Sequence, residues 1–178
     1  MCLISIQRPH IVFLVETWLS CDIPSSVLGL TDYVIYCKDR ATRGGGVLIA
    51  IRNDIRHICL ENETDCELLE IDVLLSKSIK HKFLLAYNPD VSDTNYFCAL
   101  KKILYEKVQN SKSFTIVGDF NFPDVDWVNV VFNNSKNYKI FESFFHRISP
   151  VKQSEIFLDF GCRGGKCNPR VGITYNVI

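Results

Sequence analysis

A carboxylate and an amide stand two residues apart, directly after an apolar run in the second half of the chain. Asp119 and Asn121 follow residues 114–117 and Gly118, in the order Gly-Asp-Phe-Asn. A β-branched run that ends in glycine predicts a buried strand that opens into a loop, and strand alternation would put both polar side chains on one side. A carboxylate accepts a proton from water and an amide orients that water or holds a phosphate oxygen, which suits metal-assisted phosphodiester cleavage. The alternative is an ordinary turn that uses Asp and Asn.

Three further blocks of this kind precede the first, each joined to an apolar run. They read Ile-Val-Phe-Leu-Val-Glu-Thr-Trp-Leu at 11–19, Arg-Gly-Gly-Gly-Val-Leu-Ile-Ala-Ile-Arg at 43–52 and Phe-Leu-Leu-Ala-Tyr-Asn-Pro at 83–89. In this order, and with Gly-Asp-Phe-Asn-Phe-Pro-Asp-Val-Asp-Trp at 118–127, they resemble the endonuclease/exonuclease/phosphatase superfamily. Within it they are most similar to the apurinic-type endonuclease domain of non-LTR retrotransposons. The resemblance extends from about residue 9 to residue 159.

The resemblance implies a role for each candidate site residue. Glu16 would be the principal ligand of a divalent metal, and hard oxygen ligands favour Mg²⁺, with Mn²⁺ as a substitute. Tyr87 would touch the scissile phosphate. Asp119 would bind near the metal and serve the attacking water, and Asn121 would hold that water and the phosphate. Asp159 would correspond to a late strand-borne aspartate that orients a histidine. The alternatives are a solvated strand-end carboxylate at Glu16 and simple packing at Tyr87.

The resemblance also implies elements that the chain lacks. Members of the superfamily begin with a strand that carries an asparagine, and they end with Ser-Asp-His, whereas His146 is the last histidine here and no Asp-His pair occurs. We therefore expect a partial domain over 1–160, truncated at both ends, and a divergent tail over 161–178 with a frame shift as the hypothesis for its origin.

The elements that must position these residues are readable as apolar patterns. Strand-like runs lie at 11–16, 33–36, 46–51, 68–75, 82–87, 114–118 and 156–160. Asp93 is positioned to cap a helix with apolar residues at helical spacing up to Val108, and a second helix is expected over 137–148. Such a mixture predicts sheets covered by helices. The resemblance makes the expected fold class α/β (α+β): a four-layered sandwich of two mixed β-sheets flanked by helices, incomplete, with the site at one edge.

Charge gives only a local indication of a nucleic-acid partner. The 20 basic and 20 acidic residues balance, so no overall polyelectrolyte signal exists. Basic residues do gather over 38–56 and acidic ones over 61–72, and solvated loops are an equal alternative. The three glycines at 44–46 are followed by a strand rather than a helix, which excludes a P-loop. The three glycines instead predict a turn that leads into the strand. Such a turn would let Arg43 approach DNA.

Cysteine usage and hydropathy indicate the compartment. The eight cysteines are scattered and form no Cys-x-x-Cys pair, which argues against zinc and favours reduced intracellular thiols that act mostly as small core residues. No run is long enough to span a bilayer and no signal peptide is expected. The expected localisation is intracellular, and nuclear when the protein is functional.

These patterns lead to one functional hypothesis and two alternatives. The chain is expected to be a magnesium-dependent endonuclease domain that nicks target DNA for reverse transcription, with a reverse transcriptase domain in the same polyprotein and no membrane partner. The first alternative is a phosphatase or phosphodiesterase of the same superfamily, since a fold alone does not define a substrate. The second is a catalytically inactive remnant.

Overall fold

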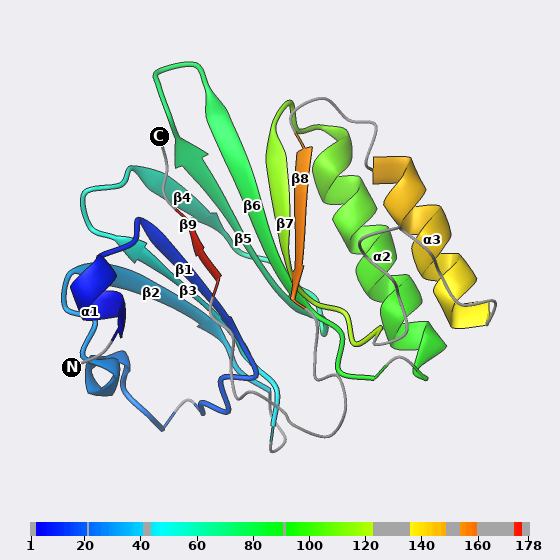
Figure 1. Ribbon diagram of the computed structural model, residues 1–178, viewed down its shortest axis with the longest axis horizontal. Helices are drawn as coiled ribbons and strands as arrows, with labels where there is room; N and C mark the ends of the chain where they lie inside the picture. Colours follow the sequence, from blue (N-terminus) through cyan, green and yellow to red (C-terminus); the bar gives the residue numbers. More distant parts are fainter. Residues whose placement is uncertain are drawn as a thin grey trace.

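The computed structural model describes residues 3–20, 22–40, 44–90, 92–122, 136–148, 154–159 and 173–175 (Figure 1). Within them the chain forms two β-sheets that pack face to face, with helices on the outer sides. The smaller sheet has the strand order β2-β3-β1-β9 and is antiparallel throughout. The larger sheet has the order β4-β5-β6-β7-β8, antiparallel up to β6 and parallel from β6 to β8. The predicted α/β fold class is thus confirmed, and the mixed pairing lies in the larger sheet.

The strands of the smaller sheet are β1 (Ile11–Val15), β2 (Tyr33–Lys38), β3 (Val47–Arg52) and β9 (Ile173–Tyr175). Those of the larger sheet are β4 (His57–Leu60), β5 (Glu67–Leu74), β6 (Lys80–Tyr87), β7 (Phe114–Asp119) and β8 (Ser154–Asp159). The helices are α1 (Leu3–Gln7), the 3₁₀ turn η1 (Ser25–Leu28), α2 (Thr94–Gln109) and α3 (Lys136–Ile148). The sequence pattern did not predict β4, β9, α1 or η1.

Three apolar layers hold these elements together. The middle layer lies between the sheets and is built from alternate residues of β1, β3, β5, β6 and β7, such as Phe13 and Phe83. A second layer joins the other face of the larger sheet to α2 and α3, which lie side by side (Figure 1). A third layer, around Val12 and Leu48, joins the smaller sheet to α1 and η1. Because both faces of β1 and β3 are covered, these strands are apolar at nearly every position.

Helix α2 forms where the sequence predicts it. The Asp93 side chain accepts a hydrogen bond from the Tyr96 backbone N–H at 3.0 Å, which caps the helix N-terminus. The buried residues Phe97, Leu100 and Leu104 recur at helical spacing and face the larger sheet. Helix α3 buries Phe141 and Phe144 in the same way.

Strand β7 continues through Gly118 rather than breaking there. Gly118 pairs with Ala86 in the parallel neighbour β6, and a Cβ at position 118 would overlap the Ala86 carbonyl oxygen. Only glycine fits this close approach of two backbones, so the residue extends the strand and brings Asp119 to its last position.

Two sequence expectations cannot be placed in the structure. Arg43 and the expected boundary at residue 160 lie outside the described residues. Within the expected tail, the described residues of β9 pair with β1.

The four cysteines in the described ranges are free thiols, of which only Cys66 is buried. Partial burial and nearby Asp39 raise the pKa of Cys37 to about 11. Within these ranges no helix has the length and apolarity that a bilayer crossing requires.

Candidate active site

Four polar residues form a row across one end of the larger sheet. Glu67 pairs with Tyr87, Tyr87 with Asp119, and Asp119 with Asp159, so adjacent strands place them side by side. Tyr87, Asp119 and Asp159 are each the last residue of a parallel strand. Ligand sites of open α/β sheets lie outside these carboxyl ends. The row therefore lies where three of the predicted site residues were expected to meet.

Asp119 and Tyr87 belong to the inter-sheet side of this row. Tyr87 and Val117 are members of the middle apolar layer, and strand alternation gives Asp119 the same side as Val117. Tyr87 is 4% exposed and Asp119 is partly exposed. The row thus combines a buried aromatic ring with a carboxylate that solvent reaches.

Asn121 is held by a turn, and strand alternation does not extend to it. β7 ends at Asp119, and the Asn121 backbone has a left-handed φ of 53°. Its N–H donates to Asp119 Oδ1 at 2.8 Å, and its Nδ2 donates to the Asn88 carbonyl oxygen at 2.6 Å. This Asx turn is the physical basis of the Asp-x-Asn spacing. Phe120 lies in the helix-side layer, opposite Asp119, as the pattern predicts.

Glu16 lies one residue beyond β1 in a constrained loop. Glu16 and Trp18 both have positive φ, at 54° and 55°. The Trp18 Nε1–H donates to Glu16 Oε2 at 2.6 Å. The loop backbone is fixed to the start of β3, because the Trp18 N–H donates to the Gly45 carbonyl oxygen at 2.9 Å. Positive φ at residues other than glycine costs free energy and is concentrated at functional sites.

Glu67 joins the two sheets at this end. Its carboxylate, 5% exposed, accepts hydrogen bonds from the Gly46 N–H and from the Arg40 guanidinium, with Arg40 Nε at 2.7 Å. Arg40 also lies over the Tyr87 ring, with 5.8 Å from its Cζ to the ring centroid. Gly46 directly precedes Val47, the partner of Val15, and Glu16 directly follows Val15. The Glu16 loop and the Tyr87–Asp119 row therefore lie at the same end of the sandwich.

Tyr96 of α2 completes this connection from the helix side. Its hydroxyl accepts a hydrogen bond from the Glu67 N–H at 2.7 Å and donates to the Tyr87 carbonyl oxygen at 3.3 Å. Burial raises the pKa of Tyr96 to about 12, so the hydroxyl stays protonated and keeps its donor role at neutral pH.

Glu16 and Asp119 are the carboxylates at this end of the sandwich that could contribute to an open divalent-metal site. Glu16 has one oxygen engaged with Trp18, while Oε1 has no hydrogen bond to a described residue. Across the described ranges no three His, Cys, Asp or Glu side chains cluster closely enough to hold a metal ion. Mg²⁺ is commonly held by one or two carboxylates with water and substrate phosphate completing its shell. Glu16 and Asp119 supply carboxylate oxygens of that kind.

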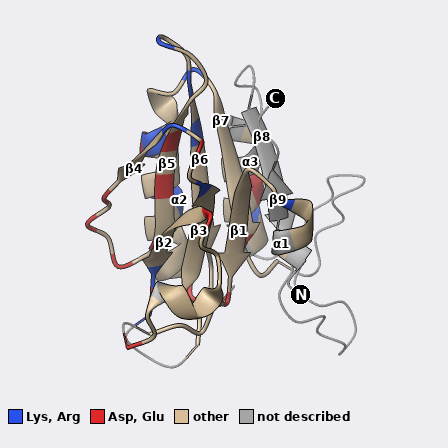
Figure 2. Cartoon of the chain, turned by 90° about the vertical axis from the view of Figure 1, so that its left-hand side faces the viewer, with Lys and Arg blue, Asp and Glu red and all other residues tan. Residues whose placement is uncertain are grey.

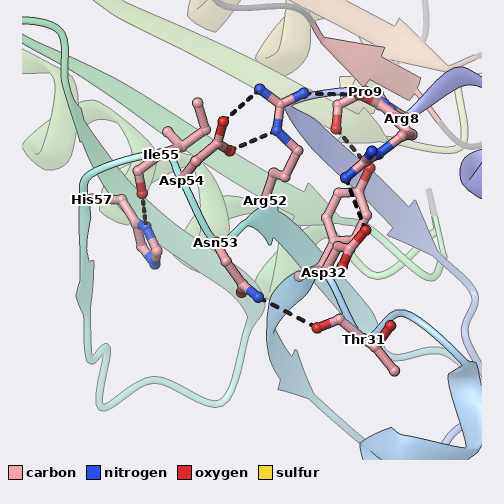
Figure 3. Close-up of polar contacts among 10 residues, drawn as sticks. Arg8, Pro9, Thr31, Asp32, Arg52, Asn53, Asp54, Ile55 and His57 are labelled. Atoms are coloured by element: carbon pink, nitrogen blue, oxygen red, sulfur yellow. Dashed lines mark hydrogen bonds and ion pairs between the residues drawn. The ribbon is translucent and has the colours of Figure 1, made fainter.

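The basic residues of 38–56 do not form one patch. Lys38 and Arg40 lie at the candidate site end, whereas β3 carries Arg52 to the opposite end of the smaller sheet. There Arg52 forms a two-pronged ion pair with Asp54 beside the Arg8–Asp32 pair, around an open hollow of about 460 Å³ (Figure 3). Charges of both signs are interspersed on the side shown in Figure 2. Strand β3 thus separates the described residues Lys38 and Arg40 from Arg52, so these three do not form one continuous patch.

Sequence reasoning missed three residues that shape the site: Asn88, Glu67 and Arg40. Asn88 is fully buried, and its Nδ2 donates to the Phe120 carbonyl oxygen at 2.9 Å. Its sequence signal is the polar residue after the β6 run, the same arrangement that marks Asp119. Glu67 is less clearly marked in the sequence, as an acidic residue at the start of the largely apolar strand β5.

Solved structures share this fold. The Neisseria 3′ phosphatase NExo, bound to product DNA hairpin, matches with a TM-score of 0.56 and 15% identity, covering 93% of this chain and 73% of that one. The 3′-5′ exonuclease NExo from Neisseria meningitidis matches at 0.54 and 16%, covering 84% and 63%. An AP endonuclease from Archaeoglobus fulgidus matches at 0.54 and 18%, covering 90% and 72%. No protein-family model and no curated protein matches the sequence. The chain has the fold of these three enzymes.

Proposed function

We propose that the chain is a metal-dependent DNA endonuclease domain of retrotransposon origin, which hydrolyses a phosphodiester bond to nick target DNA for reverse transcription. The observation that carries the proposal is the strand register that sets Tyr87, Asp119 and Asp159 side by side at the end where Glu16 lies. The shared fold supports it, since one of the similar structures is an AP endonuclease and another is bound to product DNA.

The residues divide the chemistry among them. Glu16 and Asp119 would hold Mg²⁺, or Mn²⁺ in its place, and a bound ion would supply positive charge that stabilises the negative charge on the phosphate and the leaving oxygen. Asp119 accepts a proton from the attacking water, and Asn121, fixed by Asn88, orients that water. Tyr87 contacts the scissile phosphate.

Two further residues belong to the proposal. Asp159 acts as an orienting carboxylate beside Asp119, its partner in the strand register. Arg43, which precedes β3 in the sequence, contacts the DNA backbone.

The retrotransposon origin rests on the sequence blocks Glu-Thr-Trp-Leu and Gly-Asp-Phe-Asn-Phe-Pro-Asp-Val-Asp-Trp. It implies target DNA as the substrate, a reverse transcriptase domain in the same polyprotein as the partner, and action in the nucleus.

Plasmid nicking tests the proposal. Supercoiled plasmid incubated with the chain and Mg²⁺ should become relaxed, and a chelator should abolish the reaction. Asp119→Asn keeps an oxygen that accepts the Asn121 N–H but loses the basic carboxylate, so we expect nicking to fall on the order of 100- to 10,000-fold. Glu16→Gln should reduce nicking to a comparable extent. Glu106→Gln, which changes an exposed carboxylate on α2, should leave nicking unchanged.

Unchanged nicking by Asp119→Asn and Glu16→Gln at matched protein concentration would contradict the proposal. So would a parent chain whose nicking is absent or insensitive to the chelator. Circular dichroism of each variant separates loss of chemistry from loss of fold.

A phosphatase is the second candidate, because the structure with the TM-score of 0.56 is that of a 3′ phosphatase. A panel of substrates distinguishes the two. Release of phosphate from a 3′-phosphorylated oligonucleotide or an inositol phosphate, with supercoiled plasmid left intact, would favour the phosphatase.

A further inference from the structure

Trp18 places a large aromatic ring in solvent beside the candidate metal ligand. The residue is 52% exposed and stands two positions after Glu16. About half of the side chain therefore stays accessible to a ligand.

The ring is fixed although it is exposed. Its Nε1–H donates to Glu16 Oε2 at 2.6 Å, and its backbone N–H donates to the Gly45 carbonyl oxygen at 2.9 Å. The neighbouring Thr17 N–H donates to the Gly46 carbonyl oxygen at 3.3 Å. These bonds hold the left-handed backbone at both Glu16 and Trp18. A ring that is already ordered loses less conformational freedom when a ligand stacks on it.

We propose that Trp18 is a base-stacking residue, which holds an unpaired nucleotide of the DNA substrate next to the Glu16 carboxylate. This inference rests on the proposed function. An indole face recognises the flat face of a nucleobase, and in a continuous duplex both faces of each base are covered by its neighbours. Only an unpaired, terminal or flipped nucleotide offers a free face. The chain should therefore prefer DNA that is single-stranded or opened beside the cleaved bond.

Binding measured without metal tests this separately from catalysis. The chain contains two tryptophans, Trp18 and Trp127, so Trp127→Phe leaves the Trp18 indole as the only fluorophore of its kind. In the presence of a chelator, a single-stranded oligonucleotide should quench this fluorescence, and the same sequence as a blunt duplex should quench it much less.

Two substitutions separate stacking from the support of Glu16. Trp18→Ala should weaken single-strand binding on the order of 10- to 100-fold, while Trp18→Phe should retain most of the affinity. Both lose the Nε1 donor to Glu16, but only the phenylalanine keeps an aromatic face. Val27→Ala, which removes an exposed apolar side chain of η1, is the matched control and should bind as the parent does.

Three outcomes would each contradict the stacking role of Trp18. Parent-like single-strand binding by Trp18→Ala, in a chain that still nicks DNA, would overturn the stacking role and leave the proposed function intact. Equal losses in Trp18→Ala and Trp18→Phe would overturn it in favour of a residue that only positions Glu16. A parent chain that binds no single-stranded DNA would also overturn the stacking role, while plasmid nicking with Mg²⁺ tests the proposed function separately.

Discussion

Asn88 is the buried amide on which the loop after β7 depends. Its side chain donates to the Phe120 carbonyl oxygen, its carbonyl oxygen accepts from Asn121 Nδ2, and its N–H donates to the Asp119 carbonyl oxygen at 2.9 Å. Three consecutive residues of the site loop are thus bound to one residue at the end of β6. The geometry of Asn121 is therefore a property of Asn88 as much as of its own sequence.

We expect Asn88→Ala to lower the free energy of unfolding by about 1–3 kcal/mol, because it leaves the Phe120 carbonyl oxygen buried without its donor. Nicking should fall by roughly 10- to 100-fold as the loop shifts. Urea denaturation and plasmid nicking measure the two effects. Asn53→Ala is the control, since that exposed amide bonds to the Thr31 carbonyl oxygen far from the site. Equal stability and activity in both variants would refute the role of Asn88.

The candidate residues that sequence reasoning found are those that end an apolar run. Glu16 directly follows β1 and Asp119 is the last residue of β7, so their polar side chains stand out against the apolar pattern of those strands. Asn88 also ends such a run, but its bonds go to main-chain groups more than 30 residues away. Main-chain partners leave no side-chain signal in the sequence, which is why its importance required the folded structure.

At the scale of elements, α3 holds the site loop through aromatic packing. Phe141 is 1% exposed, and its ring centroid lies 4.5 Å from that of Phe122 and 5.6 Å from that of Phe120. These two phenylalanines flank Asn121 in the chain. The helix therefore supports the loop from the side opposite the candidate site.

We expect Phe141→Ala to cost about 3–5 kcal/mol of unfolding free energy, because it opens a cavity between α2, α3 and the loop. Phe141→Leu should cost less, since it refills part of that space. Ile58→Ala, at an exposed position on the edge strand β4, should change stability by less than about 0.5 kcal/mol. Urea denaturation curves measure all three, and a loss below about 1 kcal/mol in Phe141→Ala would contradict this packing role.

A buried charge cluster joins α2 to the larger sheet. Glu70, 1% exposed in β5, forms ion pairs with Lys82 of β6 and, at 2.9 Å, with Lys107 of α2. Burial alone would raise the pKa of the Glu70 carboxyl, but the hydrogen bonds from the two lysines outweigh it. The pKa is held below the ordinary value of 4.5.

This lowered pKa predicts a loss of stability in acid. Because the folded carboxyl binds a proton less readily than the unfolded one, its contribution is fully present above the ordinary pKa and disappears as the pH falls through the lowered value. Unfolding free energies measured from about pH 7 to about pH 3 should fall less steeply for Glu70→Gln than for the parent. Glu106→Gln should follow the parent, and identical slopes in all three would refute the coupling.

Element prediction succeeded where burial produces a regular pattern. Strands β1, β3, β5, β6 and β7 match the expected runs within about two residues, since both of their faces are covered. Strand β4 lies at a sheet edge and begins at His57, so its residues resemble a loop until they pair with β5. Strand β9 is only three residues long, and pairing with β1 rather than its own composition makes it a strand.

At the scale of the whole molecule, Glu67 and Arg40 act as a clasp between the two sheets at the end where the candidate site lies. The side chain of Glu67 is 6% exposed and that of Arg40 is 29% exposed. The Arg8–Asp32 pair, at 63% and 60%, is a solvent-exposed ion pair of the same chemistry. The two pairs allow burial to be compared within one protein.

We expect Glu67→Gln to destabilise the chain by about 1–3 kcal/mol, because it leaves a partly buried guanidinium without its counter-charge. The double variant with Arg40→Met should lose less than the sum of the two single variants. Asp32→Asn should cost at most about 1 kcal/mol, since exposed pairs contribute little. Denaturation of the four proteins measures the coupling, and additive losses would show that the clasp does not form.

The arrangement of whole sheets was the part least accessible from the residues alone. Which strands pair, and in which direction, depends on contacts between residues far apart in sequence, such as Ile11 with Ile51. Apolar patterns give each strand a buried face but do not choose its neighbour. The expectation of a two-sheet sandwich came from the resemblance to a known superfamily. The strand register of the structure then showed which residues lie side by side at one end of the larger sheet.

The row of Glu67, Tyr87, Asp119 and Asp159 has a consequence for how this sequence tolerates insertions and deletions. Each residue takes its place by its count along a strand, so one residue lost within β7 would turn Asp119 to the other face and out of line with Tyr87. The turn between β5 and β6 can lengthen at small entropic cost without moving any of them. Length differences among related sequences should therefore gather in the loops, and a relative with a single-residue deletion inside β6 or β7 should have lost the row together with its chemistry.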